Sequence, residues 1–217
     1  MIELTVKALL AYLLGSLVGS LLIGKLRGVD IRTMGSGNAG ATNMLRNQGK
    51  GAALAVLVID LGKGWVATGV LAPWAIPGLE PAPGGMHSLV LAVCGLTVIL
   101  GHVYPVWYGF RGGKGFATFI GAVLGIDLGL VPAMILTWLL AVILTGFVGL
   151  ASIASAAAVA IAIAVRSSTL GRPLLVFGIL ATLLIIYTHR ANISRMLAGK
   201  EPRARRLWLF GLRRGQG

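Results

Sequence analysis

Side chains that can hold a phosphate group gather in the stretch GSGNAGATNMLRNQGK, residues 35–50. Its glycines let backbone N–H groups approach an anion closely, and its Ser, Thr and Asn residues add short hydrogen-bond donors. Arg46 adds a planar guanidinium that can bind two phosphate oxygens at once. This combination predicts an anion-binding site for a phosphorylated substrate.

Two further polar stretches have the same character. The stretch GHVYPVWYGFRGGKGFAT, residues 101–118, surrounds Lys114 with glycines and offers a point charge to a phosphate. The third is divided between GLASIAS, residues 149–155, and HRANISR, residues 189–195. Side chains three residues apart share one face of a helix. We therefore expect one face of the last segment to carry His189, Asn192 and Arg195.

The glycine pattern of the first stretch does not indicate a nucleotide-binding domain. Gly35, Gly37 and Gly40 spell G-x-G-x-x-G, and Asp60 follows at a spacing of about 20 residues, as in a dinucleotide-binding turn. That turn follows a β-strand, whereas this one lies between long apolar runs, so the required context is missing. The run GGKG around Lys114 is not a Walker A loop either, because a glycine follows the lysine where Ser or Thr is needed.

Composition places these stretches in a membrane protein. The chain has 217 residues, of which 57% are hydrophobic and only 12% are charged. Its mean hydropathy is +0.90. A soluble domain of this size could not bury so much apolar surface. The net charge of +13 is then typical of cationic cytoplasmic loops beside anionic lipid, and we expect no nucleic-acid partner.

The apolar runs predict an all-α integral membrane protein with one polytopic domain over residues 1–217. A helix crosses a bilayer with about 17–25 apolar residues, and several runs have that length or nearly so. The first is expected to be retained as a span and not removed as a signal peptide. We expect seven transmembrane helices near 5–24, 52–74, 87–104, 116–126, 130–147, 152–165 and 173–189.

Charge decides between six spans and seven. Merging the fourth run with the fifth, despite Asp127 and Pro132 between them, would carry the cationic C-terminal tail across the membrane. Seven crossings put most of the 19 Lys and Arg on the side of the C-terminus, which the positive-inside rule makes cytoplasmic, with the N-terminus outside. The residues on that side are Lys25, Arg27, Arg32, Arg46, Lys50, Arg111, Lys114, Arg190, Arg195, Lys200, Arg203, Arg205, Arg206, Arg213 and Arg214. All three polar stretches then lie at cytoplasmic ends of spans and are predicted to form one site.

Some polar residues within the spans have structural explanations. Asp60 and Lys63 are three residues apart and are expected to pair, which lowers the cost of burying either charge. His102 either braces the end of its span or contacts a ligand, and His189 is either a site residue or a headgroup anchor. Cys94, the single cysteine, lies inside an apolar run, so we expect no disulfide and no reactive thiol.

Three glycines inside the spans have a packing explanation. Gly15, Gly19 and Gly62 are of the kind that allows two helices to approach closely in a membrane. No His or carboxylate cluster has the spacing of metal ligands, so a metal site is not expected.

The strings GSGNAGATNMLR, GHVYPVWYGFRGGKGFAT and HRANISRMLAGKE resemble, in order and spacing, the three signature motifs of the bacterial acyl-phosphate:glycerol-3-phosphate acyltransferases, the PlsY family. The resemblance covers nearly the whole chain. It implies an enzyme of phospholipid synthesis in the bacterial plasma (inner) membrane that uses acyl phosphate, and not acyl-CoA or acyl carrier protein. The implied product is 1-acyl-glycerol 3-phosphate (lysophosphatidic acid). No cofactor is implied, and the functional partner is the enzyme that makes acyl phosphate.

The resemblance also implies the site residues. The predicted catalytic residues are Ser36, Lys114, Ser152 and His189. The predicted substrate-binding residues are Gly37, Asn38, Gly40, Asn43, Arg46, His102, Gly112, Gly113, Gly115, Thr118, Asn192 and Arg195. One position departs from the family, which commonly has S-L-x-S-I where this chain has Gly149 in place of the first serine. We expect the second serine, Ser152, to be the functional one.

An acyl phosphate has a good leaving group, so charge stabilisation and alignment can supply much of the catalysis without a protein nucleophile. A transporter for an anionic solute is the rival, but its polar breaks would lie near the midplane, and no inverted repeat is visible. A CDP-alcohol transferase would need clustered aspartates, and the chain has only Asp30, Asp60 and Asp127.

Overall fold

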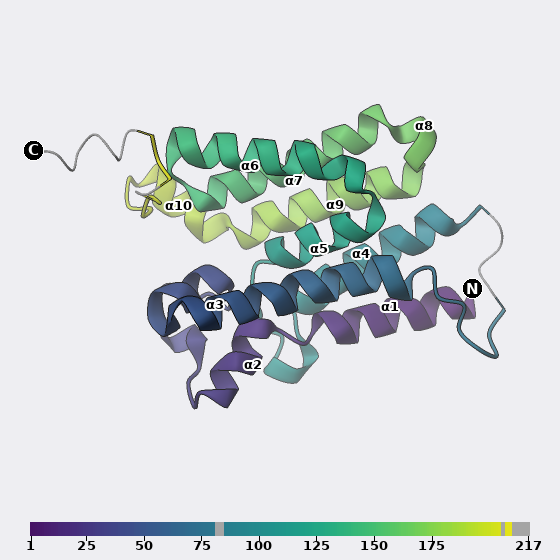
Figure 1. Ribbon diagram of the computed structural model, residues 1–217, viewed down its shortest axis with the longest axis horizontal. Helices are drawn as coiled ribbons and strands as arrows, with labels where there is room; N and C mark the ends of the chain where they lie inside the picture. Colours follow the sequence, from purple (N-terminus) through teal and green to yellow (C-terminus); the bar gives the residue numbers. More distant parts are fainter. Residues whose placement is uncertain (81–84, 205–206, 210–217) are drawn as a thin grey trace, which may run out of the picture. The chain divides into compact units, whose positions relative to one another are not determined.

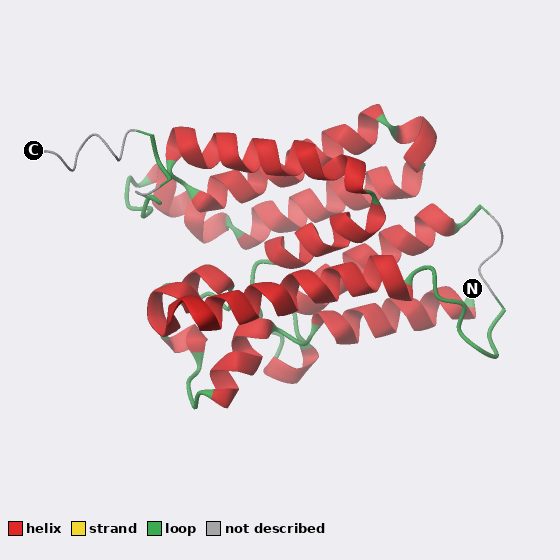
Figure 2. Cartoon of the chain, viewed as in Figure 1, coloured by secondary structure: helices red, strands yellow, loops and turns green. Residues whose placement is uncertain are grey.

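The computed structural model describes residues 1–80, 85–204 and 207–209, and every element in this part of the chain is helical (Figures 1 and 2). The chain divides into two compact units, Met1–Leu128 and Gly129–Gly217. The tail cations Arg205, Arg206, Arg213 and Arg214 and the centre of the predicted external loop, 81–84, lie outside the described residues.

The first unit is built from pairs of helices that approach closely at glycines. Its helical elements are α1 (Ile2–Gly15), α2 (Gly19–Leu26), η1 (Ile31–Thr33), α3 (Ala41–Trp65), the π-helical η2 (Val66–Leu71), α4 (His87–Val103), η3 (Val106–Tyr108) and α5 (Phe116–Ile126). Helix α1 packs against α4, and α3 packs against α5. A Cβ at Gly15 would meet the backbone of Val98, and one at Gly64 would meet the Thr118 carbonyl oxygen.

The packing explanation is therefore confirmed for two of the three glycines named above. Gly15 contacts α4, and a Cβ at Gly19 would lie 3.0 Å from the Val56 carbonyl oxygen. The expectation is wrong for Gly62, because its Cβ would meet nothing within 4 Å among the described atoms. Close approach of another helix is thus not the reason for a glycine at position 62 in the described part of the chain.

The first predicted span is broken, and the second begins earlier than predicted. Residues 5–24 form two helices, α1 and α2, bent by 44°. Helix α3 begins at Ala41, inside the first polar stretch, and has non-helical angles at Gly49 (φ 85°, ψ 178°). The predicted start at residue 52 lies just after that interruption, because hydropathy detects the apolar part of the helix and not the polar turns before it.

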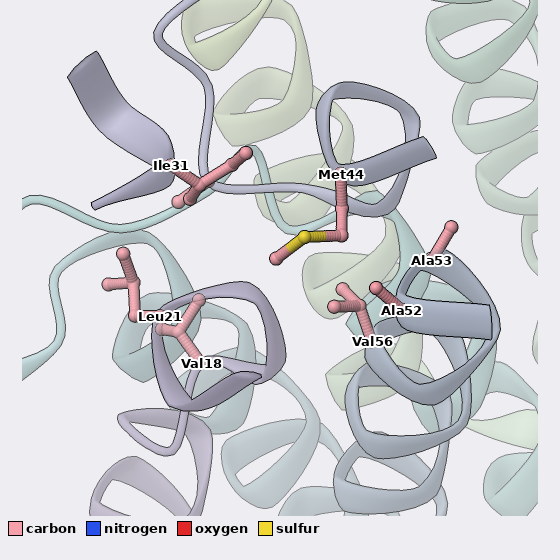
Figure 3. Packing of buried hydrophobic residues seen from close by; sticks show 8 residues of the cluster. Val18, Leu21, Ile31, Met44, Ala52, Ala53 and Val56 are labelled. Atoms are coloured by element: carbon pink, nitrogen blue, oxygen red, sulfur yellow. The ribbon is translucent and has the colours of Figure 1, made fainter. Parts of the chain in front are cut away.

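Buried apolar side chains hold the first polar stretch against the break between α1 and α2 (Figure 3). Ile31 and Met44 lie before and after the glycine loop and are fully buried. They pack with Val18 beside the break and with Val56 of α3. Burial of side chains of this size contributes about 1.5–3 kcal/mol each, so the loop has a fixed base.

The second unit is an antiparallel helical bundle with a bent end. Residues 128–130 form the short helix η4, followed by α6 (Val131–Thr145), α7 (Val148–Val165), α8 (Ser167–Leu170), α9 (Arg172–Thr188) and α10 (Arg190–Leu197). Helix α7 packs against both α6 and α9. Gly146, with φ 77°, permits the tight turn from α6 to α7. Helices α9 and α10 are bent by 56° at His189.

Separate fourth and fifth helices were predicted, and the structure confirms them. Helix α5 ends at Ile126, and Asp127 has extended backbone angles. Pro132 lies in the first turn of α6, where a proline costs no helical hydrogen bond. Among the described residues four helices are long and apolar enough to cross a membrane, or up to six if each bent pair is one span. Helix α5 has only 11 residues, so the count of seven spans stays a prediction.

Candidate active site

The first polar stretch is a loop whose shape is set by Asn43. The Asn43 side chain is buried, and its Oδ1 accepts a hydrogen bond from the Ser36 backbone N–H at 3.0 Å. Its Nδ2 donates to the carbonyl oxygens of Ile31 and Met34 at 3.1 and 2.9 Å. All three bonds are to the protein's own backbone, so Asn43 supports the loop from inside. Its predicted role toward substrate is indirect in this geometry.

Other residues of the stretch face outward. Gly35 and Gly37 have φ values of 54° and 69°, which favour glycine and turn the loop at Ser36. Ser36 is exposed, and Asn38 and Gly40 are half-buried. Gly40 is the N-cap of α3, whose first N–H groups point toward the loop. This arrangement presents short donors and a helix N-terminus, which together suit an anion.

Arg46 lies on the second turn of α3 and is exposed. In the part of the chain that the structure describes, its guanidinium has neither a carboxylate nor a carbonyl partner. An arginine without an internal partner keeps all its donors for a ligand. The structure therefore leaves Arg46 available for the role predicted for it.

The second polar stretch is a loop folded back on the end of α4. The Gly112 N–H donates to the Val103 carbonyl at 3.0 Å, and the Gly113 N–H donates to the His102 carbonyl at 3.1 Å. A Cβ at Gly113 would collide with the His102 ring and with the Ala39 carbonyl oxygen. These glycines therefore permit close backbone packing, and their N–H groups are already used within the protein. Backbone contacts to phosphate from Gly112 and Gly113 are not available in this geometry.

The same contact joins the first two polar stretches. Ala39 belongs to the first and Gly113 to the second, and no side chain separates them. Lys114 is half-buried directly after this contact. Gly115 has a φ of 83° and is the N-cap of α5. Thr118 lies further along α5 and is fully buried, with its carbonyl oxygen against Gly64.

The predicted pairing of Asp60 with Lys63 is confirmed, and His102 joins it. The Lys63 ammonium lies 3.0 Å from Asp60 Oδ1 and 2.9 Å from His102 Nδ1. His102 Nδ1 lies 3.3 Å from the same Asp60 oxygen. All three side chains are buried. Of the two roles left open for His102, this geometry supports the brace.

In the second unit, His189 has a defined tautomer. Its Nδ1 lies 2.8 Å from the Ile185 carbonyl oxygen, which can only accept a hydrogen bond. The Nδ1 atom therefore carries a proton, and Nε2 is the acceptor nitrogen of the neutral ring. His189 is buried at the bend between α9 and α10. A histidine fixed in this way suits a general base.

Gly149 and Ser152 line the start of α7. A Cβ at Gly149 would lie 3.1 Å from the Asn192 Cβ, so the glycine lets α10 approach α7 closely. A serine here would press on Asn192, which gives the departure from the family pattern a packing reason. Ser152 is buried, and its hydroxyl donates to the Val148 carbonyl at 3.0 Å, one turn earlier.

The predicted site residues are thus divided between the units. The first unit holds Ser36, Asn38, Arg46, His102 and Lys114, and the second holds Ser152, His189, Asn192 and Arg195. Within each unit the polar stretches come together as predicted. Assembly of both sets into one site stays a prediction.

Comparison with known proteins decides the family. The sequence profile described as glycerol-3-phosphate acyltransferase matches residues 5–199. A glycerol-3-phosphate acyltransferase of Aquifex aeolicus (strain VF5) is 40% identical over 194 residues, which cover 89% of this chain and 95% of the relative. The chain belongs to this family. A second relative, from Synechococcus sp. (strain CC9902), is 37% identical over 195 residues, which cover 89% of this chain and 92% of that relative.

Solved structures of an integral membrane glycerol-3-phosphate acyltransferase, PlsY (YgiH), have the same fold. Its glycerol 3-phosphate form matches with a TM-score of 0.82 and 37% identity, covering 92% of this chain and 94% of that one. Its lysophosphatidic acid form matches with a TM-score of 0.80 and 36% identity over the same shares. The predicted family and the all-helical membrane class are therefore confirmed.

Arg32 was not predicted from the sequence as a site residue. Its guanidinium binds Asp30 through Nε and Nη2 at 2.8–3.1 Å. Its Nη1 donates to the carbonyl oxygens of Tyr108 and Arg111 at 3.1 and 3.3 Å. Arg32 hydrogen bonding holds the pKa of Asp30 below its usual range. The spacing Asp30-x-Arg32 was visible in the sequence, but its partners across the second stretch were not.

Glu201, which follows α10, was likewise not predicted from the sequence as a site residue. Its Oε1 accepts from Asn192 Nδ2 at 2.6 Å, and its Oε2 accepts from Arg195 Nε at 2.6 Å. Both predicted substrate-binding side chains are therefore held by one carboxylate. The signal that could have found it is an isolated Glu among the cations of the tail.

Among the described residues, no three His, Cys, Asp or Glu side chains lie close enough to hold a metal ion. Cys94 is fully buried in α4, as predicted.

Proposed function

We propose that this chain transfers an acyl group from acyl phosphate to the 1-hydroxyl of glycerol 3-phosphate, giving 1-acyl-glycerol 3-phosphate and inorganic phosphate. The observation that carries the proposal is the contact of the two polar stretches of the first unit at Ala39 and Gly113. Two phosphorylated substrates need two adjacent anion sites, and this contact supplies neighbouring loops for them. Support also comes from the family's solved relative, whose two forms are named for glycerol 3-phosphate and lysophosphatidic acid.

In this proposal the first unit binds phosphate. Arg46 has no internal partner among the described residues and is exposed, as is Ser36, so it can clamp a phosphate through two parallel hydrogen bonds. Lys114 supplies a point charge after the loop contact, and Asn38 adds a donor. Neutralising phosphate charge lets the two anionic substrates approach each other.

The chemical step needs no covalent intermediate on the protein. The 1-hydroxyl oxygen of the acceptor attacks the acyl carbonyl carbon, a new C–O bond forms, and the bond from that carbon to the phosphate oxygen breaks. The hydroxyl proton passes to His189 Nε2, and inorganic phosphate leaves. The alternative recipient of the proton is an oxygen of the departing phosphate. Fixing of the His189 tautomer by the Ile185 carbonyl favours the histidine.

A covalent acyl-enzyme and a metal-dependent route are both excluded in this proposal. Cys94, the single thiol, is fully buried in α4. An acid quench during turnover with labelled donor and no acceptor should leave no label on the protein. A chelator should leave the rate unchanged. Trapped label, or loss of rate that is restored by a metal ion, would overturn direct metal-free transfer.

We further propose seven spans in the inner membrane of a bacterium, with the N-terminus outside and with the C-terminus and the active site on the cytoplasmic side. Exposed Gly85 and Lys200 offer cysteine positions for labelling, and the fully buried Cys94 gives a silent background. G85C and K200C should label from opposite sides of sealed vesicles. Labelling from the same side would contradict the seven-span topology.

The donor is tested by competition. Purified protein in detergent receives glycerol 3-phosphate with equal concentrations of acyl phosphate and acyl-CoA carrying different isotopic labels. The product lysophosphatidate should carry the label of acyl phosphate alone. Incorporation of the acyl-CoA label at a comparable rate would contradict the proposed donor.

A further inference from the structure

The buried charges of the first unit have more contacts with the polar stretches than a simple ion pair requires. Asp60, Lys63 and His102 are each less than 5% exposed. Taking charges out of water costs several kcal/mol each, and a buried pair often gives no more stability than apolar residues of the same size. Ionisable residues inside a membrane protein are functional candidates for that reason.

Lys63 and Asp60 bind backbone groups at the break between α1 and α2. The Lys63 ammonium donates to the carbonyl oxygens of Gly15 and Leu17 at 2.8 and 3.1 Å. Asp60 Oδ1 accepts from the Gly19 N–H at 3.1 Å. These backbone groups lie at a helix interruption, where helical partners are missing. The pair thus holds the bent helix in place against α3.

The contact between Lys63 and His102 determines which ring nitrogen of His102 carries the proton. An ammonium only donates hydrogen bonds, and Lys63 Nζ lies 2.9 Å from His102 Nδ1. His102 Nδ1 also lies 3.3 Å from Asp60 Oδ1, but its contact with Lys63 is the shorter one. We therefore assign the Nδ1 lone pair to the bond from Lys63 and the single ring proton to Nε2. Asp60 balances the charge of Lys63, so the ring next to them is neutral.

The other side of the His102 ring faces the second polar stretch. A Cβ at Gly113 would meet His102 Nε2 and Cε1, so the ring edge lies directly on the Gly113 backbone. The His102 carbonyl also accepts the Gly113 N–H at 3.1 Å. Lys114 is the next residue after Gly113, so a movement of the His102 ring would also move Lys114 and its ammonium.

We propose that Asp60 and Lys63 are positioning residues that hold His102 as a neutral, Nε2-protonated ring, and that this ring sets the position of Gly113 and Lys114 for phosphate binding. The inference rests on the proposed function, since it assigns Lys114 to a substrate phosphate. Besides holding the break between α1 and α2, Asp60 and Lys63 act on the substrate site through His102.

The same unit contains a matched control. Glu3 and Lys7 form a second buried pair, with 3.0 Å between Lys7 Nζ and Glu3 Oε1. Lys7 also donates to the Ala72 carbonyl oxygen at 2.8 Å. Both side chains are as buried as Asp60 and Lys63, and Ala72, which accepts the hydrogen bond from Lys7, lies outside the polar stretches. Neutralising this pair therefore perturbs a buried charge pair without touching His102.

The kinetic test compares two double variants, D60N/K63M and E3Q/K7M. Each removes both charges of a pair, which avoids an unpaired buried charge. D60N/K63M should raise the KM for glycerol 3-phosphate or for acyl phosphate about tenfold with a smaller change in kcat, at a melting temperature close to that of E3Q/K7M. E3Q/K7M should keep both constants. Wild-type KM values in D60N/K63M would overturn the positioning role.

A measurement on the wild-type protein needs no activity and uses one variant, H102Q, only to assign the resonance. The chain has 3 histidines, and ¹⁵N-labelled histidine distinguishes the two neutral tautomers from the imidazolium by NMR. The resonance absent from H102Q should be the Nε2-protonated neutral form at pH 7. An imidazolium, or a proton on Nδ1, would overturn the inference. An inactive wild-type protein with the expected tautomer would instead count against the proposed function alone.

Discussion

Two arginines on the predicted cytoplasmic face, one in each unit, differ in what surrounds them. Arg46 in the first unit is exposed and has no partner among the described residues. Arg195 in the second unit binds Glu201 at 2.6 Å, and Glu201 also binds Asn192. Sequence position suggested the same role for both. Their surroundings indicate that Arg46 is kept for a ligand, whereas Arg195 organises the end of the second unit.

The contrast extends to the rest of each unit. In the first, buried Asn43 and the Asp60–Lys63 pair support the loops that carry Arg46 and Lys114, the cations proposed to bind phosphate. In the second, His189 is oriented by donating to the Ile185 carbonyl, and Asn192 is oriented by donating to Glu201. In the proposed mechanism the first unit binds substrate charge, and the second serves proton transfer and alignment.

Replacement of His189 should give the largest effect. H189A removes the proposed base, so kcat should fall by about 10²- to 10⁴-fold, the range typical of general base catalysis. The KM for glycerol 3-phosphate should change little, and the pH profile of kcat should flatten. Steady-state kinetics over a range of pH gives both quantities. A loss confined to KM would make His189 a binding residue and leave the proton to phosphate.

Exchange of the two arginines for lysine tests the comparison directly. R46K replaces a fork with a point charge, and loss of one charge-assisted hydrogen bond of about 1.5–3 kcal/mol lowers kcat/KM roughly 10- to 100-fold. R195K retains a cation for Glu201 and should stay within a few-fold of wild type. Protein abundance and melting temperature serve as controls. Equal losses of kcat/KM in R46K and R195K would show that the two arginines do not differ in role.

Removal of the Glu201 charge should affect stability more than binding. E201Q weakens the bonds to Asn192 and Arg195, and the Arg195 side chain is 39% exposed, so solvent screening limits the loss. A loss of about 1 kcal/mol corresponds to a drop in melting temperature of roughly 2–4 °C for a chain of this length. The double variant E201Q/R195Q should lose less than the sum of the single variants. Strict additivity would show that the two side chains act separately.

The link between Asp30 and Arg32 should give the smallest effect. Arg32 lowers the pKa of Asp30, so the stabilisation is complete above the unfolded carboxyl pKa of about 4 and is lost only as pH falls through the lowered folded value. At pH 6–8, D30N should cost less than about 1 kcal/mol because the pair is partly exposed. Melting curves of wild type and D30N should converge in strongly acidic buffer. A difference that grows as pH falls would contradict the assignment.

Hydropathy and charge predicted the helices better than the contacts among them. The ends of α4 and α5 and the break at Asp127 follow from apolar runs and from residues that end helices. The bend after Gly15 and the kink at Gly49 were missed, since averaging over a window hides one interrupted turn. The Asp60–Lys63 pair was predictable because both residues lie on one helix.

The missed site residues share a different cause. Arg32 reaches carbonyl groups of Tyr108 and Arg111, far along the chain, and such partners depend on how loops pack. The N–H groups of Gly112 and Gly113 are likewise used by α4 and not by phosphate, which spacing alone cannot reveal. Motif position predicts where the chemistry lies, but tertiary contacts show which of these residues are already used to support the loops.

Product analysis of a single reaction tests the central claim most directly. Wild-type protein is given glycerol 3-phosphate and acyl phosphate with a ¹³C-labelled carbonyl, and the products are followed by ³¹P and ¹³C NMR. The account predicts that 1-acyl-glycerol 3-phosphate and inorganic phosphate appear in equal amounts, with the label in the ester carbonyl. Phosphate release without the ester, or acylation at the 2-position, would contradict it.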